Sequence, residues 1–349
     1  MTAAFCTLLL AVASVPCLLY AVPFLLGRWR KKPPPHADPL RLCVLIPAHN
    51  EAVGLPRTLR AVFAADYPPG LLRVLVVADN CTDGTATVAK LHGAEVVTRT
   101  DPANRGKGHA LAFGLPHALT GAEAVIVLDA DCTVNADFLK RMSDTLRTAE
   151  AVQAAVVSRP NGTPAGYVAA VGAGIDNAVA AGADRLGGRV PLRGTGMGFR
   201  RELLERLPWS AFGLAEDAEY AAVLARHKVR VRWAAGAEVV SDAPGTSEAF
   251  AVQRTRWSSA LRLNPLASKP LLLAHLLATS VIVLSLVPDL FFVIWLALLL
   301  ALTTGMYAAA AWPLGRPPVS SVKVVAKLLA VAVNGVRRKG GEWQRTPRS

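Results

Sequence analysis

The pattern of apolar and polar positions divides the chain into two long apolar runs and a middle region of shorter ones. Residues 1–27 contain no Asp, Glu, Lys or Arg, and residues 270–315 contain only Asp289. About 20 apolar residues cross a bilayer as a helix. The first run therefore predicts one spanning helix over about residues 4–26, and the second predicts two helices joined by a turn at 287–289. The alternatives are a cleaved signal peptide and a buried helical hairpin.

Basic residues flank both apolar runs, and they predict how the helices are oriented. Four basic residues directly follow the first run: Arg28, Arg30, Lys31 and Lys32. The second run is preceded by Arg254, Arg256, Arg262 and Lys269 and followed by Arg316, Lys323 and Lys327. No basic residue lies at its turn. Positive flanks stay in the cytoplasm. We therefore expect about three spans in the cell membrane, with the middle region in the cytoplasm. The amphipathic pattern over 319–336 is expected to lie along the lipid surface.

In the middle region, from about residue 40 to 260, short apolar runs alternate with helical periods. This alternation is typical of βαβ units and predicts an α/β fold with a mostly parallel sheet flanked by helices. The strands are expected at 42–46, 73–78, 95–98, 124–128 and 151–157, with helices from about 54, 85 and 110. The predicted divisions of the chain are 1–32 (helix and basic flank), 33–265 (catalytic domain), 266–316 (two spanning helices) and 317–349 (interfacial helix and basic tail).

Composition supports a soluble domain that shares its chain with membrane segments: 52% of residues are hydrophobic and 18% are charged. The net charge of +13 is compatible with nucleic acid or with an anionic lipid surface and polyphosphate ligands. Because much of the basic charge borders the apolar runs, we expect membrane lipids and no nucleic acid as partners. The five cysteines have no CxxC spacing, so neither a zinc site nor a disulfide framework is predicted.

Polar residues follow three of the predicted strands. They are PAHNE at 47–51, DNCTDGT at 79–85 and DAD at 129–131. Ligands of such sheets bind at the carboxyl ends of the strands, so three polar clusters indicate one shared crevice. Each cluster alone has a simpler explanation: Asp83, for example, is well placed to cap a helix.

The carboxylates of Asp129 and Asp131 lie one residue apart at the end of a buried strand. Together they can present oxygens to a hard cation such as Mg²⁺ or Mn²⁺. Such a metal would bridge the two phosphates of a nucleoside diphosphate and neutralise its charge as it departs.

Two further motifs begin predicted helices. Lys107, within RGKG, would attract phosphate at a helix start, although an exposed basic turn is an equal alternative. Glu216 and Asp217 begin another helix, where one carboxylate can act as general base; acidic residues are also favoured there by the helix dipole alone. The segment GTGMGFRR at 194–201 is expected to form a loop over the crevice and open a helix.

The segment QRTRW at 253–257 precedes the second apolar run. Guanidinium groups of Arg254 and Arg256 can pair with phosphate oxygens, and the face of Trp257 can support a sugar ring. The alternative is a basic membrane flank with an interfacial tryptophan.

Taken in order, these motifs resemble the inverting family 2 glycosyltransferases. QRTRW is similar to the Q-x-x-R-W signature of the membrane synthases related to cellulose, chitin, hyaluronan and poly-N-acetylglucosamine synthases. The resemblance implies a GT-A fold, a UDP-linked sugar donor, Mg²⁺ or Mn²⁺, and a lipid or growing glycan acceptor. It also implies a role for each motif. The nucleoside would be held by Ala48, Glu51 and Asp79, with Asp83 as a further candidate, and the metal and diphosphate would be held by Asp129 and Asp131. Asp217, beside Glu216, would take the acceptor proton, and the site would be closed by Gln253, Arg256 and Trp257, with Arg254 beside them.

The chain departs from the synthases at AED, where many processive members have TED, and in its three predicted spans. A single transfer to lipid, or a short polymer exported by a partner protein, fits that number of spans better. Two other functions stay open at this point: a nucleotidyltransferase on a related fold, and a non-catalytic component of a polysaccharide assembly system.

Overall fold

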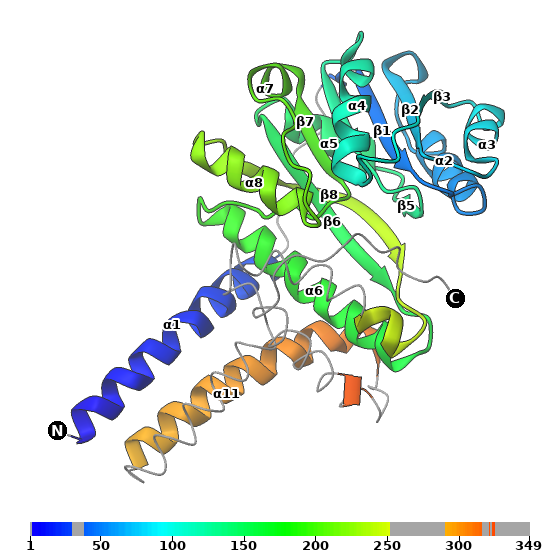
Figure 1. Ribbon diagram of the computed structural model, residues 1–349. Coiled ribbons are helices and arrows are strands. Elements are labelled where there is room, and N and C mark those ends of the chain that lie inside the picture. Colours follow the sequence, from blue (N-terminus) through cyan, green and yellow to red (C-terminus); the bar gives the residue numbers. More distant parts are fainter. Residues whose placement is uncertain (1, 30–37, 252–289, 316–320, 322, 325–349) are drawn as a thin grey trace. The chain divides into compact units, whose positions relative to one another are not determined.

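A computed structural model describes residues 2–29, 38–251, 290–315, 321, 323 and 324 (Figure 1). The chain forms two compact units. The sheet unit comprises Arg30–Arg159 and Gly187–Asp242, and the helical unit comprises Met1–Trp29, Pro160–Leu186 and Ala243–Ser349.

The sheet unit is built on one mixed sheet of eight strands in the order β3-β2-β1-β4-β7-β6-β8-β5. Its strands are β1 (Leu42–Ala48), β2 (Leu72–Asp79), β3 (Glu95–Arg99), β4 (Ala124–Val127), β5 (Cys132–Val134), β6 (Ala151–Arg159), β7 (Met197–Arg200) and β8 (Val231–Asp242). The neighbours from β3 to β4 pair in parallel, and β6 pairs in parallel with β8. Strand β7 runs antiparallel to both β4 and β6, and β5 runs antiparallel to β8. The predicted parallel strands are confirmed, but the sheet as a whole is mixed.

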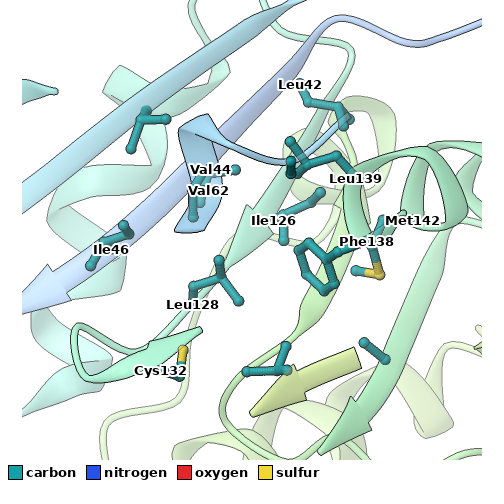
Figure 2. Close-up of a cluster of buried hydrophobic side chains, with 14 of the residues drawn as sticks. Leu42, Val44, Ile46, Val62, Ile126, Leu128, Cys132, Phe138, Leu139 and Met142 are labelled. Atoms are coloured by element: carbon teal, nitrogen blue, oxygen red, sulfur yellow. The ribbon is translucent and has the colours of Figure 1, made fainter. Parts of the chain in front are cut away.

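The sheet unit's helices follow the predicted βα alternation. They are α2 (Leu55–Phe63), η1 (Pro69–Leu71), α3 (Thr85–Leu91), α4 (Lys107–Leu119), α5 (Phe138–Leu146), α7 (Arg201–Arg206) and α8 (Glu216–Arg226). On one face of the sheet, Val44 and Ile126 pack with Phe138 and Met142 of α5 (Figure 2). On the other face, a Cβ on Gly114 of α4 would lie 2.9 Å from Leu45 Cδ1. Side chains alternate between the faces of a strand, so burial on both faces explains the nearly unbroken apolar runs.

The register of the parallel strands brings the predicted polar clusters to one edge. Ala48 at the end of β1 pairs with Ala78 of β2, and Leu45 pairs with Val127 of β4. The residues that follow β1, β2 and β4 therefore lie at the same edge of the sheet. This confirms the shared edge that was predicted from the strand-end pattern.

The expectation for residues 194–201 is partly wrong, because Met197–Arg200 forms strand β7 in the middle of the sheet before α7 begins. Met197 and Phe199 are fully buried. A Cβ on Gly198 would lie 2.8 Å from Val152 Cγ2, so a side chain there would crowd the neighbouring strand. Gly198 thus serves to fit a strand into a crowded sheet, whereas Gly194 and Gly196 lie in the bend before it, with φ of 77° and 65°.

The helical unit contains α1 (Thr2–Arg28), α6 (Pro164–Arg185), α11 (Leu290–Ala311) and η4 (Trp312–Leu314). Helices α1 and α11 lie side by side and run in the same direction (Figure 1). Residues near the start of α1 pack with residues near the start of α11, and residues near the end of α1 pack with residues near the end of α11. Trp295 Nε1 donates to Ser14 Oγ at 3.1 Å, and further along Cys17 Sγ lies 4.0 Å from Thr303 Oγ1.

By length and composition, two helices of the described residues could cross a membrane: Cys6–Arg28 and Val293–Leu314. They correspond to the first and third predicted spans. The second span and the turn at 287–289 lie outside the described residues, as does most of the predicted amphipathic segment 319–336.

Helix α6 is rich in Gly and Ala, and its small residues face α1. A Cβ on Gly182 would lie 1.8 Å from the carbonyl oxygen of Pro23, and Arg185 Nη1 donates to the carbonyl of Leu26 at 2.6 Å. Small residues thus let α6 approach the α1 backbone closely. The predicted domain boundaries stay a prediction, but Pro160–Leu186, placed within the catalytic domain, packs with the terminal helices.

Candidate functional site

The loops that follow β1 and β2 are tied together by hydrogen bonds. Cys81 Sγ donates to the carbonyl of Ala48 at 3.4 Å, and the amide of Glu51 donates to Thr85 Oγ1 at 2.8 Å. Asn50 and Asn80 both adopt left-handed backbone angles, with φ of 55° and 50°. Such backbone is sparsely populated outside glycine and concentrates at functional sites. The predicted nucleoside-binding residues are therefore held in one rigid pair of turns.

Asp79 ends β2 and is buried against a guanidinium. Arg99 Nη1 donates to Asp79 Oδ1 at 2.7 Å, and the two side chains are only 9% and 8% exposed. The side-chain Nδ2 of Asn80 donates to the same oxygen at 3.0 Å, and Arg99 Nη2 donates to Asp101 Oδ2 at 2.8 Å. A paired, buried carboxylate of this kind is fixed in position and has its charge balanced.

Asp83 is hydrogen-bonded to the backbone beside α3, but it is not the residue that caps this helix, which is Gly84. Its carboxylate accepts hydrogen bonds from the amides of Thr85 at 3.0 Å and Ala52 at 3.2 Å. Burial acts to raise its pKa, but these hydrogen bonds and one from the Thr85 hydroxyl lower it overall. Asp83 therefore joins the starts of α2 and α3.

A second group of residues surrounds the ammonium of Lys107, the first residue of α4. Lys107 Nζ donates to Asp129 Oδ1 at 2.5 Å and to the carbonyl of Gly194 at 2.6 Å, and lies 3.8 Å from Glu216 Oε1. A Cβ on Gly194 would lie 3.7 Å from Asp217 Oδ2, and its φ of 77° favours glycine. The structure thus brings four predicted site residues together: Lys107, Asp129, Glu216 and Asp217.

Burial shifts the pKa values of these charged groups. It raises the pKa of Glu216 to about 7, against the attraction of Lys107, and it raises that of Asp217. Burial alone would lower the pKa of Lys107, but Asp129 and Glu216 raise it above its usual value. Carboxylates with raised pKa values in a buried cluster are characteristic of acid–base sites.

The turn that carries Asp131 is fastened to α2. Thr58 Oγ1 donates to the carbonyl of Ala130 at 2.8 Å, and Arg57 Nη2 donates to the carbonyl of Asp131 at 3.3 Å. The amide of Asp129 donates to Thr195 Oγ1 at 3.1 Å. Both carboxylates of the DAD motif therefore project from an anchored turn.

No three His, Cys, Asp or Glu side chains of the described residues gather into a set that would hold a metal unaided. Mg²⁺ bound with a nucleotide takes one or two carboxylates and completes its shell with phosphate oxygens and water. The pair Asp129 and Asp131 fits that requirement. A cation already lies at Asp129, since the ammonium of Lys107 is surrounded there by oxygens.

Several residues of the site were not predicted. Arg99 ends β3, so the strand-end argument applied to the other parallel strands would have found it. Gly194 and Thr195 lie in a motif that was singled out, but their contacts with Lys107 and Asp129 depend on the course of the chain into β7. Gln253, Arg254, Arg256 and Trp257 lie outside the described residues, and their roles stay predictions.

Comparison with known proteins gives consistent relatives. A family model described as "Glycosyltransferase like family 2" matches residues 39–260. The probable glycosyltransferase YdaM of Bacillus subtilis (strain 168) is 27% identical over 228 residues, which cover 62% of this chain and 54% of YdaM. An uncharacterized glycosyltransferase of Mycobacterium tuberculosis (strain ATCC 25618 / H37Rv) is 41% identical over 99 residues, 28% of this chain and 40% of that protein. The chain thus spans about half, or less, of the length of these relatives.

Among solved structures, the mannosyltransferase PcManGT from Pyrobaculum calidifontis, in complex with GDP-Man and Mn²⁺, has a TM-score of 0.59 and 24% sequence identity. The match covers 96% of this chain and 99% of that one, and it shows a shared fold. Since the family model matches well over half of the chain, the protein belongs to the family 2 glycosyltransferases, and its sheet unit has the GT-A fold.

Proposed function

We propose that the protein is an inverting, metal-dependent glycosyltransferase. It transfers a sugar from a nucleotide donor to a lipid or growing glycan acceptor at the cytoplasmic face of the membrane. The observation that carries this proposal is the buried cluster at the end of β4, where Lys107, Asp129, Glu216 and Asp217 meet. Such a cluster combines a cation that can attract phosphate, a carboxylate that can bind a metal and carboxyl groups that can take a proton, which suits sugar transfer from a nucleoside diphosphate.

In the proposed reaction, an acceptor hydroxyl attacks the anomeric carbon in line with the departing diphosphate. The oxygen–carbon bond forms as the carbon–phosphate-oxygen bond breaks, and the acceptor proton passes to the carboxylate of Asp217. The pKa of Asp217 is raised by burial, which makes its carboxylate a better proton acceptor than an exposed aspartate. A divalent metal held by Asp129 and Asp131 would neutralise charge on the leaving diphosphate. The ammonium of Lys107 lies beside Asp129 and could pair with phosphate oxygens of the same group.

The donor is proposed to be UDP-linked, because the resemblance places uridine at Glu51 and Asp79. The rigid turns around these residues support a nucleoside site at this edge. The complex of PcManGT with GDP-Man makes guanosine the principal competitor, so both nucleotides belong in any donor panel.

The helical unit supports membrane attachment. Helices α1 and α11 are parallel, so their carboxyl ends would lie on one side of a bilayer. In the sequence, both ends carry basic residues: Arg28 is the last residue of α1, and Arg316 follows the segment that ends α11 and η4. The positive-inside rule would put those ends in the cytoplasm, with about three spans in all. A lipid acceptor would then be presented where the donor is available, and an export partner would be needed only for a polymer.

Exchanging Asp217 for asparagine tests the proposal. We expect Asp217→Asn to bind the donor nucleotide with nearly wild-type affinity but to lose transfer, because an amide cannot accept the proton. Glu219→Gln, on the same helix α8 and hydrogen-bonded instead to the amide of Gly213 at 3.0 Å, is the matched control and should keep its activity. Substantial turnover by Asp217→Asn would eliminate this residue as the base.

A further inference from the structure

The ammonium of Lys107 is enclosed by oxygens in the manner of a bound cation. Asp129 Oδ1 lies at 2.5 Å, the carbonyl oxygen of Gly194 at 2.6 Å and Glu216 Oε1 at 3.8 Å. The side chain is only 20% exposed. Two carboxyl groups and one backbone carbonyl thus gather around a single positive charge that water reaches poorly.

Asp129 is also one of the two carboxylates expected to hold the divalent metal. An oxygen that accepts a hydrogen bond from an ammonium at 2.5 Å already shares its negative charge with that cation, so it is a weaker ligand for a second one. A metal on the other oxygen would still bring two positive charges close to a third in a partly buried setting, where repulsion is strong. Metal binding at Asp129 is therefore weakened while Lys107 stays, and it favours departure of the ammonium.

The departing lysine needs another anion, because an unpaired ammonium at this depth is costly. Lys107 is the first residue of α4, and Gly106 before it has a φ of 123°. The 13-residue helix directs its positive end to the same place. A donor diphosphate bound beside the metal would supply phosphate oxygens within reach of the lysine chain.

We propose that Lys107 acts as an internal counter-cation that occupies the metal-binding carboxylate in the donor-free protein and passes to the donor diphosphate when metal and nucleotide bind together. Lys107 is then a positioning residue that makes the two binding events depend on each other. Bare metal binds weakly because it must break the ion pair, whereas metal with diphosphate binds well because the lysine gains a new partner. The inference rests on the proposed function, since it takes Asp129 as a metal ligand.

Linkage gives the inference a measurable form. If nucleotide increases metal affinity by some factor, metal increases nucleotide affinity by the same factor. Removing the charge with Lys107→Met should tighten Mn²⁺ binding to the nucleotide-free protein by about tenfold, a typical size for such coupling, and should weaken nucleoside diphosphate binding. A residue with a merely structural role, or one that only binds phosphate, would not tighten metal binding when removed.

The experiment uses the full-length protein in detergent, with free Mn²⁺ measured by its EPR signal in the absence and presence of UDP or GDP. Lys107→Arg keeps the charge and should bind bare Mn²⁺ as weakly as the wild type. Lys90→Met removes a lysine from the exposed last turn of α3 and serves as the charge control. Lys107→Gln replaces the methionine variant if the latter does not show cooperative melting.

Tighter Mn²⁺ binding by Lys107→Met, with no change in Lys90→Met, would support the exchange. Equal or weaker Mn²⁺ binding by Lys107→Met, when the wild type binds Mn²⁺ with nucleotide, would overturn the exchange and leave the proposed function standing. Failure of the wild type to bind Mn²⁺ under either condition would overturn both the metal role and the exchange.

Discussion

Replacing Glu216 with glutamine is expected to stabilise the donor-free protein at high pH and to have little effect at low pH. The side chain of Glu216 is 13% exposed, and its burial raises its pKa from 4.5 to about 7, although Lys107 lies 3.8 Å away. Ionising this carboxyl is therefore less favourable in the folded protein than in the unfolded chain, so ionisation destabilises the fold. Glutamine has a similar shape and carries no charge.

The size of the effect follows from the pKa values. Each pKa unit is worth about 1.4 kcal/mol, so a rise from 4.5 to about 7 corresponds to roughly 3 kcal/mol. Because the folded pKa is above the unfolded one, the stabilisation by the neutral carboxyl is complete below about pH 4.5. It is lost as the pH rises through about 7. For a unit of this size, 3 kcal/mol corresponds to roughly 6–12 °C in melting temperature.

Thermal melting of the wild type and Glu216→Gln at several pH values between 5 and 8.5, without metal or nucleotide, measures this difference. We expect the two melting temperatures to be close at pH 5 and to separate in favour of the variant by pH 8. Glu205→Gln on α7, whose carboxylate is 54% exposed, is the control and should show no such separation. A gap for Glu216→Gln that is absent, or equal at all pH values, would refute the argument from burial.

Three further substitutions test other parts of the structure. Asp131→Ala should weaken metal-dependent donor binding, and an unchanged Mn²⁺ titration in the presence of nucleotide would rule out that residue as a ligand. Arg99→Met should lower the free energy of unfolding by about 3–5 kcal/mol, because the Asp79 carboxylate is left buried without its guanidinium partner. It should also weaken nucleotide binding. Denaturant titration measures the first effect and binding calorimetry the second. Gly182→Ala should lower the melting temperature, since its Cβ would lie 1.8 Å from an α1 backbone oxygen. Gly305→Ala should not, because among the described residues its Cβ would meet no atom within 4 Å outside its own helix backbone.

The parallel part of the sheet was predictable because its strands are buried on both faces and each is followed by polar residues. That single regularity located β1, β2 and β4 and the common edge of their loops. It also led to Asp79 and Asp129, whose positions depend only on the strand that precedes them. The carboxyl end of β3 obeys the same rule, and Arg99 was missed because the rule was not carried one strand further.

The antiparallel strands and the packing of α6 could not be obtained from the pattern. Strand β7 has only four residues, and its glycine signals a loop in isolation but permits close packing between β4 and β6. The small residues of α6 acquire a meaning only beside α1, where they admit a backbone at close range. The contact between Lys107 and Gly194 likewise joins residues 87 positions apart, and no local periodicity encodes it.

The most direct test of the central claim is a donor screen on the purified full-length protein. UDP- and GDP-sugars would each be incubated with Mg²⁺ or Mn²⁺ and a membrane lipid extract, and released nucleoside diphosphate would be measured. Sugar transfer predicts release of nucleoside diphosphate from one donor, dependent on both metal and acceptor and abolished by Asp217→Asn. Release of pyrophosphate, or no release from any donor by folded protein that binds nucleotide, would contradict it and favour a nucleotidyltransferase or a non-catalytic assembly component.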